Sequence, residues 1–370
     1  MKIIADQNMP LVQELFAEFG DIELLPGREI CAADLLGADL LLVRSVTQVN
    51  QQLLADSNVK FVGSATIGTD HVDRDYLHAA GIEFAHAPGC NAEAVVQYDL
   101  SAICRLMPDW QAKTIGIVGC GNVGSRLYKR LLALGVNCVV YDPFLDVDSV
   151  PDLVDFDTLI GSDIICLHTP LTSDGEYPTY HLFDAEVLAR LKPDCLLINA
   201  GRGAVIDNKA LYAAFKEGLS AQVVLDVWEP EPLVDVNLMP FIAIGTPHIA
   251  GYSLEGKIKG THMVFEAFKQ WAGMTSGTDY TAAPEEGRHL LAADDLNQGI
   301  VACYDVSQDS RRMADAMQNL EPGSRAIAKA FDQLRRDYPV RREFSHYQLS
   351  ANTNHSAGFK CLGFVVDRAD

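Results

Sequence analysis

The chain has 370 residues, of which 48% are hydrophobic, and its formal net charge is −21. A chain of this length is longer than a typical single domain, which predicts two or three domains. So acidic a chain repels a phosphate polyanion, which argues against a nucleic-acid partner. Residues 286–370, however, hold 11 Lys and Arg against 12 Asp and Glu. A nearly neutral tail suits contact with a second copy of the chain, although a merely balanced surface explains it equally well.

The nine cysteines are scattered and form no C-x-x-C pair. This usage predicts free thiols in a reducing cytoplasm, with neither a disulfide framework nor a metal site. The start, Met1 to Asp6, reads as a strand running into a polar turn, and no apolar run reaches eighteen residues. We therefore expect a cytoplasmic protein with no export signal and no membrane span.

The first ninety residues alternate short apolar runs with helical patterns, which predicts βαβ units and a parallel sheet. The expected strands are Lys2–Ala5, Asp39–Val43, Val59–Gly63 and Ile82–Ala85. The expected helices are Pro10–Phe19, Asn50–Leu54 and Asp73–Ala80. A longer helix over Asn91–Met107 is expected to cross into a second domain.

A second α/β unit follows this helix. Its expected strands are Thr114–Val118, Asn137–Tyr141, Ile164–His168, Cys195–Asn199, Gln222–Val227 and Ile242–Gly245. Six parallel strands predict a complete doubly wound sheet. A helix over Leu254–Trp271 then returns the chain to the first domain, so that residues 1–92 and 254–280 flank an inserted domain of residues 93–253. The stretch Gly273–Asp279 reads as a linker.

The tail, residues 286–370, reads as a separate small α+β unit. We expect a strand near Gly299–Val306, helices near Ser310–Asn319 and Gly323–Asp337, and strands near Glu343–Ser350 and Lys360–Val366.

The most informative motif ends the strand Thr114–Val118 in three glycines, Gly119, Gly121 and Gly124, with Asp142 closing the next strand. In this pattern the first glycine permits a tight turn, the second lets the backbone approach a pyrophosphate, and the third lets the helix pack on its strand. An ordinary turn between strand and helix is the alternative. The motif predicts a dinucleotide site, with Asp142 on the adenosine ribose. No basic residue in Tyr141–Asp148 would receive a 2′-phosphate, which favours NAD over NADP.

Arg202 lies between two glycines just after the strand Cys195–Asn199. The carboxyl ends of strands in a doubly wound sheet open onto the ligand crevice. There an arginine can grip a carboxylate with its bidentate fork, or it can cap a turn by bonding backbone carbonyls.

Further acids and a histidine follow the next strand ends. Asp226 ends one strand, Glu229 and Glu231 lie in a proline-rich turn, and His248 follows the last strand. A histidine can take the proton of a hydroxyl group while a carboxylate orients its ring. Taken alone, the histidine could be structural and the acids solvated. Together with the glycine motif they indicate a dehydrogenase.

The sequence resembles the D-isomer-specific 2-hydroxyacid dehydrogenases. The resemblance is carried by the glycine motif and by the runs Leu197–Asp207, Leu225–Pro232 and Thr246–His248. The resemblance implies Arg202 as binder of the substrate carboxylate, Glu231 as partner of the histidine, and His248 as acid and base. By register, Glu229 is not the catalytic acid. The cofactor-binding residues that it implies are Gly119, Gly121, Asn122, Val123, Gly124, Asp142, Thr169, Asp226 and Gly251.

Five further segments resemble a member of this family that oxidises a small phosphorylated 2-hydroxy acid: Met1–Pro10, Val43–Thr47, Gly63–Asp73, Ala87–Ala92 and His248–Ser253. Arg44, Ser45 and Thr66 are then candidates for the phosphate, and Tyr252 for a further substrate contact. Arg44 could instead form an ion pair, and Ser45 a turn bond.

The resemblance covers the whole chain. It implies a doubly wound Rossmann domain inserted in a flavodoxin-like substrate domain, followed by a C-terminal dimerisation domain and hence a homodimer. Two alternatives remain open. One is a phosphoglycerate dehydrogenase of the same family, whose regulatory extension often has a βαββαβ order that this tail does not show. The other is a dinucleotide-sensing binding protein without turnover.

Overall fold

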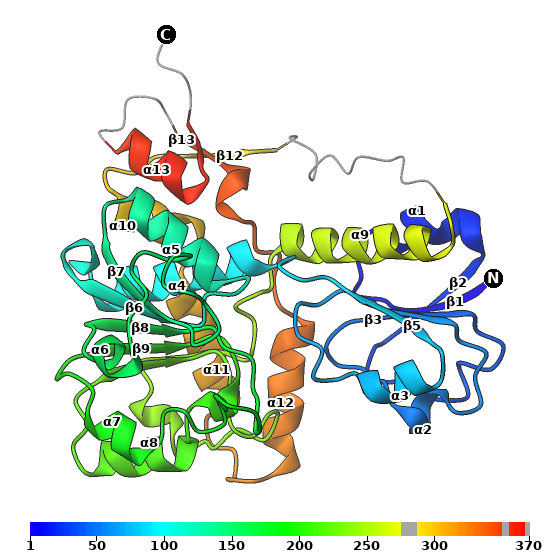
Figure 1. Cartoon of the computed structure of the whole chain (residues 1–370), viewed down its shortest axis with the longest axis horizontal. Coiled ribbons are helices and arrows are strands. Elements are labelled where there is room, and N and C mark those ends of the chain that lie inside the picture. The colour runs from blue at the N-terminus through cyan, green and yellow to red at the C-terminus, as the bar shows by residue number, and fades with distance from the viewer. Residues whose placement is uncertain (275–286, 350–354, 367–370) are drawn as a thin grey trace. The chain divides into compact units, whose positions relative to one another are not determined.

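The computed structural model describes residues 1–274, 287–349 and 355–366. They form two compact units, Met1–Asn91 with Ser253–Gly287, and Ala92–Tyr252 with Arg288–Asp370. We call these the first and the second unit (Figure 1). Within these described ranges, no helix combines the length and the apolar character needed to cross a membrane.

The first unit holds a five-stranded parallel sheet in the order β2-β1-β3-β4-β5. This is the flavodoxin-like order. Its strands are β1 Lys2–Asp6, β2 Asp21–Leu25, β3 Leu40–Val43, β4 Phe61–Ser64 and β5 Glu83–His86, and its helices are α1 Val12–Phe16, η1 Ala17–Phe19, α2 Gln51–Leu54, α3 Arg74–Ala79 and α9 Leu254–Trp271.

Helices cover both faces of this sheet, and one of them, α9, comes from a much later part of the sequence than the others. Phe16 of α1 and Phe268 of α9 pack on one face, with ring centroids 5.4 Å apart, while Leu54 of α2 and Leu77 of α3 are buried on the other. Helix α9 therefore belongs to the first unit, and its bounds match the prediction.

The strand β2 was missed by the sequence analysis. It is an edge strand whose residues are all partly or fully exposed, and two of its five residues are acidic. Such a strand lacks the continuous apolar run that marks the buried strands of a parallel sheet.

The second unit holds a six-stranded parallel sheet in the order β11-β10-β9-β8-β6-β7. Its strands are β6 Thr114–Val118, β7 Asn137–Tyr141, β8 Ile164–Leu167, β9 Leu196–Asn199, β10 Gln222–Leu225 and β11 Ile244–Gly245. The chain runs outward in opposite directions from β6, toward β7 on one side and toward β8 on the other. The gap between the carboxyl ends of β6 and β8 is therefore the switch point at which such sheets bind ligands.

Helices cover both faces of this sheet and bury two hydrophobic clusters. The first cluster lies under α4 Ala92–Leu106 and α5 Gly124–Ala133, and the second lies under α6 Phe156–Ile160, α7 Ala185–Ala189 and α8 Asn208–Lys216. Short 3₁₀ turns complete the unit at η2 Trp110–Ala112, η3 Gly203–Val205 and η4 Met239–Phe241.

The tail has a small parallel sheet of its own, in the order β12-β13-β14. Its elements are β12 His289–Leu291, α10 Leu296–Cys303, α11 Val306–Met317, α12 Arg325–Arg336, η5 Phe344–His346, β13 Tyr347–Leu349, α13 Ser356–Leu362 and β14 Val365–Val366. Its apolar side chains join both clusters of the second unit: Ile300 and Phe359 join the first, and Ile327 and Phe331 join the second.

Two predictions for the tail were wrong. Gly299–Val306 is not a strand, because Asp295 caps a helix there by accepting from the Gln298 backbone N–H at 2.8 Å. The β-branched residues of that run suggested a strand, but a Cβ on Gly299 would lie 2.3 Å from Phe359, so the glycine serves close helix packing. Most of Lys360–Val366 is likewise not a strand, since α13 continues to Leu362 and Gly363 ends it at φ +97°.

The order in the tail is therefore not the β-α-α-β-β that the sequence suggested. The end of the expected strand Glu343–Ser350, and the expected linker from residue 275 on, lie outside the described residues. By its packing the tail belongs to the second unit, and its role as a dimerisation domain stays a prediction.

Candidate active site

The glycine motif forms the turn between β6 and α5. Gly119 has φ +86°, a conformation that favours glycine. A Cβ on Gly124 would lie 1.9 Å from the Gly119 carbonyl oxygen. The protein itself therefore requires the first and third glycines. At Gly121 a Cβ would meet nothing within 4 Å, so the chain leaves open space beside this residue.

Several groups around this turn fit a dinucleotide. Asp142, at the end of β7, accepts from the Cys120 backbone N–H at 2.9 Å and from the Phe144 N–H at 3.1 Å, which holds its carboxylate beside the glycine turn. The Thr169 hydroxyl, beyond the end of β8, is buried and has no hydrogen-bond partner among the described residues. Its methyl carbon would lie 3.1 Å from a Cβ on Gly119. The open space at Gly121 and this hydroxyl suit the polar groups of a bound NAD.

Of the remaining cofactor candidates, Asn122 and Val123 continue the same turn, and the Asn122 carbonyl accepts from the Arg126 guanidinium. Gly251 lies two residues before Ser253, which caps α9 through a bond from the Gly256 N–H at 2.9 Å.

His248 and Glu231 form the central hydrogen-bonded pair of the site. The His248 Nδ1 and the Glu231 Oε2 are 2.8 Å apart, and the two side chains are 35% and 22% exposed. The other carboxylate oxygen accepts from the Trp228 backbone N–H at 2.9 Å. Because Nδ1 faces Glu231, Nε2 is the ring nitrogen that can exchange a proton with a substrate.

The environment of Glu231 keeps it ionised. Burial alone would raise its pKa, but the His248 ring, the bond from Trp228 and the charge of Arg335 outweigh burial, and the pKa is lowered. An ionised carboxylate at this distance stabilises the imidazolium that forms when His248 takes a proton.

Asp226 fixes the loop that carries His248. Its carboxylate accepts from the Thr246 hydroxyl at 2.7 Å and from the backbone N–H groups of Ile249 and Ala250 at 2.8 and 2.9 Å. Burial raises the pKa of Asp226, although the His248 charge and these bonds oppose the shift. His248 itself is held at φ +57°, an uncommon conformation for a residue other than glycine, of the kind that clusters at functional sites.

Arg202 follows the end of β9, beside β10. Its Nη1 donates to the Gly201 carbonyl at 2.8 Å, and its own carbonyl accepts from the Asn199 amide at 2.9 Å. A Cβ on Gly203 would lie 1.9 Å from the Trp228 carbonyl oxygen, so the Arg202 loop packs directly on the backbone that leads to Glu231. The structure thus places Arg202, Glu231 and His248 beyond the carboxyl ends of β9, β10 and β11.

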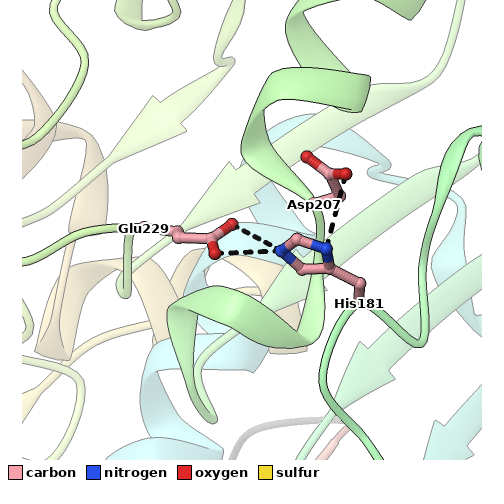
Figure 2. Close-up of side chains that lie close together, drawn as sticks. All are labelled: His181, Asp207 and Glu229. Carbon is pink, nitrogen blue, oxygen red and sulfur yellow. Dashed lines mark hydrogen bonds and ion pairs between the residues drawn. The ribbon is translucent and has the colours of Figure 1, made fainter.

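Glu229 has a different partner, as its register implied. It accepts from His181 Nε2 at 2.9 and 3.0 Å, while Asp207 lies 3.5 Å from Nδ1 (Figure 2). The two carboxylates approach opposite ring nitrogens, so in this arrangement they do not converge on one nitrogen as the ligands of a single metal ion would. His181 was not a candidate from sequence, because it lies in no motif.

In the first unit, Arg44 and Ser45 follow β3 and Thr66 follows β4, at neighbouring strand ends. Arg44 Nη1 donates to the Asn8 carbonyl at 3.4 Å. The Thr66 hydroxyl donates to the Gly68 carbonyl at 2.7 Å and bonds the Ser64 hydroxyl at 2.7 Å. The structure does not relate these residues to His248, which lies in the other unit.

Tyr252 lies between aromatic and cationic groups of the tail. Its ring meets the Tyr338 ring edge-on at 5.7 Å, and the Arg335 guanidinium lies 5.7 Å from its centroid. The sequence analysis missed Arg335. Nothing in the sequence separates it from Arg336, since both are cations in the last turn of a helix.

Two family models match the chain. One, described as the NAD-binding domain of D-isomer specific 2-hydroxyacid dehydrogenases, matches residues 97–250. The other, described as a domain of unknown function, matches residues 286–363. The first match confirms the prediction of an NAD-binding Rossmann domain.

Relatives at high identity span the full chain. The chain is 48% identical to an erythronate-4-phosphate dehydrogenase of Teredinibacter turnerae, over 100% of both chains. It is 44% identical to one of Cellvibrio japonicus, over 98% of this chain and 100% of that protein. Among solved structures, a D-lactate dehydrogenase of Aquifex aeolicus complexed with NAD and lactic acid shares the fold. Its TM-score is 0.64 at 24% identity, over 74% of this chain and 96% of that one.

Proposed function

Because the chain belongs to the erythronate-4-phosphate dehydrogenase family of D-isomer specific 2-hydroxyacid dehydrogenases, we propose that it oxidises 4-phospho-D-erythronate. The product is 2-oxo-3-hydroxy-4-phosphobutanoate, and the reaction serves the synthesis of pyridoxal 5′-phosphate. The observation that carries the proposal is the 2.8 Å pair of His248 and Glu231 beside the carboxyl ends of an NAD-binding sheet.

In this reaction NAD supplies the hydride acceptor. His248 Nε2 takes the proton of the substrate 2-hydroxyl group, and Glu231 holds the ring and stabilises the resulting imidazolium. Arg202 grips the carboxylate with its guanidinium fork, which fixes the carbon that loses the hydride. Asp142 bonds the adenosine ribose and repels the 2′-phosphate of NADP. Asp226 lies at the nicotinamide end.

The substrate phosphate is assigned to the first unit. Arg44 supplies a charge-assisted hydrogen bond, and Ser45 and Thr66 supply hydroxyl groups at the neighbouring strand end. Tyr252 adds a hydroxyl contact to the substrate. These four assignments rest on the motifs in the sequence and on the placement of Arg44, Ser45 and Thr66 at the carboxyl ends of β3 and β4.

The working protein is further proposed to be a cytoplasmic homodimer. The free state of all nine cysteines suits a reducing compartment. The dimer is assigned to the tail, whose surface carries nearly balanced charge and exposes Leu290 and Val340 at 80% and 75%.

The substrate assignment is tested with Arg44→Ala. We expect this change to raise KM for 4-phosphoerythronate far more than for unphosphorylated erythronate, because only the phosphate loses a charge-assisted pair. Arg74→Ala, at an exposed arginine of α3, is the matched control and should leave both KM values unchanged. Equal weakening of both acids by Arg44→Ala, or a preference of the unaltered enzyme for 3-phosphoglycerate, would reduce the assignment to an unspecified D-2-hydroxyacid dehydrogenase.

A further inference from the structure

The helix α12 of the tail ends beside the candidate active site. Its buried residues Ile327 and Phe331 lie in the same hydrophobic cluster as Leu225 and Trp228, which lead into the Glu231 turn. This packing fixes the last turn of α12 (Figure 1, orange). Arg335 of that turn lies next to Tyr252.

The guanidinium of Arg335 is held between aromatic rings. It lies 5.7 Å from the centroid of Tyr252 and 5.9 Å from that of Phe331, distances at which a cation is attracted to an aromatic ring. Tyr338, just beyond α12, packs edge-on against Tyr252 from the tail as well. Tyr252 is therefore positioned by the tail, although it belongs to the loop of His248.

The charges of Arg335 and Glu231 stabilise each other. Burial alone would lower the pKa of Arg335, but Tyr252, including a hydrogen bond between the side chains, and the carboxylates of Glu231 and Asp332 raise it. Reciprocally, Arg335 is one of the groups that lower the pKa of Glu231. Glu231 thus interacts electrostatically with two basic side chains, His248 and Arg335.

A second arginine of the tail binds the same loop. Arg341 is buried, lies 4.3 Å from the Tyr304 ring centroid, and donates to the Ala250 carbonyl, two residues after His248. The loop 248–252 is therefore attached to the tail by two independent contacts, one at Ala250 and one at Tyr252.

The competing explanation for Arg335 is a favourable charge at a helix C-terminus. Arg336 occupies the same last turn and is exposed, so it offers the same charge to the helix. The contact with the Tyr252 ring and the electrostatic interaction with Glu231 distinguish Arg335 from it.

We propose that Arg335 is a positioning residue of the active site, which holds Tyr252 and balances the charge of Glu231, so that the tail completes the site. The proposal deepens the proposed function and rests on it for the role of His248. One consequence concerns His248. With Arg335 present, its positive charge partly balances the carboxylate of Glu231. When a neutral residue replaces Arg335, His248 lies in a more negative environment, which favours its protonated form.

The charged and titratable groups around this pair come from several elements. Asp226 lies at the end of β10 and interacts with His248, Tyr252 shares its loop, and Tyr338 from the tail bonds Asp309 of α11 at 2.8 Å. Asp332 lies one turn before Arg335 on α12. Tyr252 and Asp332 also interact with Arg335, so the charge-preserving variant Arg335→Lys is needed to separate the effect of its charge from the effect of its contacts.

The test compares Arg335→Gln, Arg335→Met, Arg335→Lys and the control Arg336→Gln in the full-length chain. The pKa of His248 is measured by NMR of the histidine ring protons without substrate, with His248→Ala used to assign its signal. We expect the two neutral variants to raise this pKa by roughly half a unit to one unit. Arg335→Lys, which keeps the charge, and Arg336→Gln should change the pKa of His248 by at most about a fifth of the shift seen in the neutral variants.

The pH profile of kcat/KM for the oxidation gives a second readout. Oxidation needs neutral His248, so the acid limb of the profile should move to higher pH in the neutral variants by the same amount. An unchanged His248 pKa in a folded neutral variant, or an equal shift in Arg336→Gln, would overturn the proposal. If the unaltered enzyme fails to oxidise 4-phosphoerythronate while the NMR shift is present, the proposed function fails and the positioning role stands.

Discussion

At the scale of single residues, two acids in one turn have separate partners. Glu231 bonds His248 at 2.8 Å, and Glu229, two residues earlier, bonds His181 at 2.9 Å. Sequence spacing alone could not assign these partners, because both acids lie in the same proline-rich turn. The resemblance supplied the register, and the structure places Glu231 against His248.

This separation yields a matched pair of variants. We expect Glu231→Gln to lower kcat, because the imidazolium formed in the reaction loses its charge partner. The acid limb of the kcat/KM profile should also move to lower pH, since the neutral ring of His248 is then favoured. Steady-state rates across pH measure both effects. Glu229→Gln removes the same charge at the His181 pair and is expected to leave the limb in place. A shift of equal size in both variants would contradict the assignment of Glu231.

At the scale of elements, two glycines of the turn between β6 and α5 are needed for different reasons. Gly124 is required by the protein, because a Cβ there would lie 1.9 Å from the Gly119 carbonyl oxygen. Gly121 meets nothing within 4 Å, so the requirement for a glycine there comes from the ligand that approaches the backbone.

These two positions should therefore respond differently to alanine. Gly124→Ala is expected to destabilise the fold by about 1–3 kcal/mol through overpacking. Gly121→Ala should leave the melting temperature nearly unchanged and weaken NAD binding. Thermal unfolding, followed with and without NAD, separates the two effects. A large loss of stability in Gly121→Ala, or unaltered NAD affinity, would count against this interpretation of the turn.

Much of the fold could be predicted from the sequence, for identifiable reasons. The strands β6 and β7 and the helix α9 have the predicted bounds. Both strands are marked in the sequence by a run of apolar residues, and α9 has a Ser253 cap. The helix α10 was read as a strand, since its β-branched residues hide the need for Gly299 to pack on Phe359. The role of Arg335 also escaped prediction, because it depends on packing between the tail and the sheet.

At the scale of the whole molecule, the tail is part of the second unit. Ile300 and Phe359 share a cluster with the helices α4 and α5, and Phe331 shares the other cluster. On α11 of the tail, Ser310 also accepts from the Gly245 N–H of the edge strand β11 at 3.1 Å. Removing the tail would expose both clusters and this edge.

Truncation near residue 285 is therefore expected to give insoluble chain or an unstable monomer, because exposed apolar clusters and an uncovered strand edge promote aggregation. For the full chain, sedimentation at micromolar concentration should show a homodimer. A full-length monomer would contradict the dimer proposal. A stable, soluble truncated chain would contradict the claim that the tail completes both hydrophobic clusters of the second unit.

The central claim is that His248 removes the proton as 4-phospho-D-erythronate reduces NAD. The most direct measurement mixes the full-length enzyme with NAD and this acid and follows NADH formation in a single turnover, so that slow product release does not hide the chemistry. We predict one NADH per site, formed faster than with 3-phosphoglycerate, and a rate about 10²–10⁴-fold lower in His248→Ala. No NADH from the unaltered enzyme, faster reduction with 3-phosphoglycerate, or near-normal rates in His248→Ala would contradict the account.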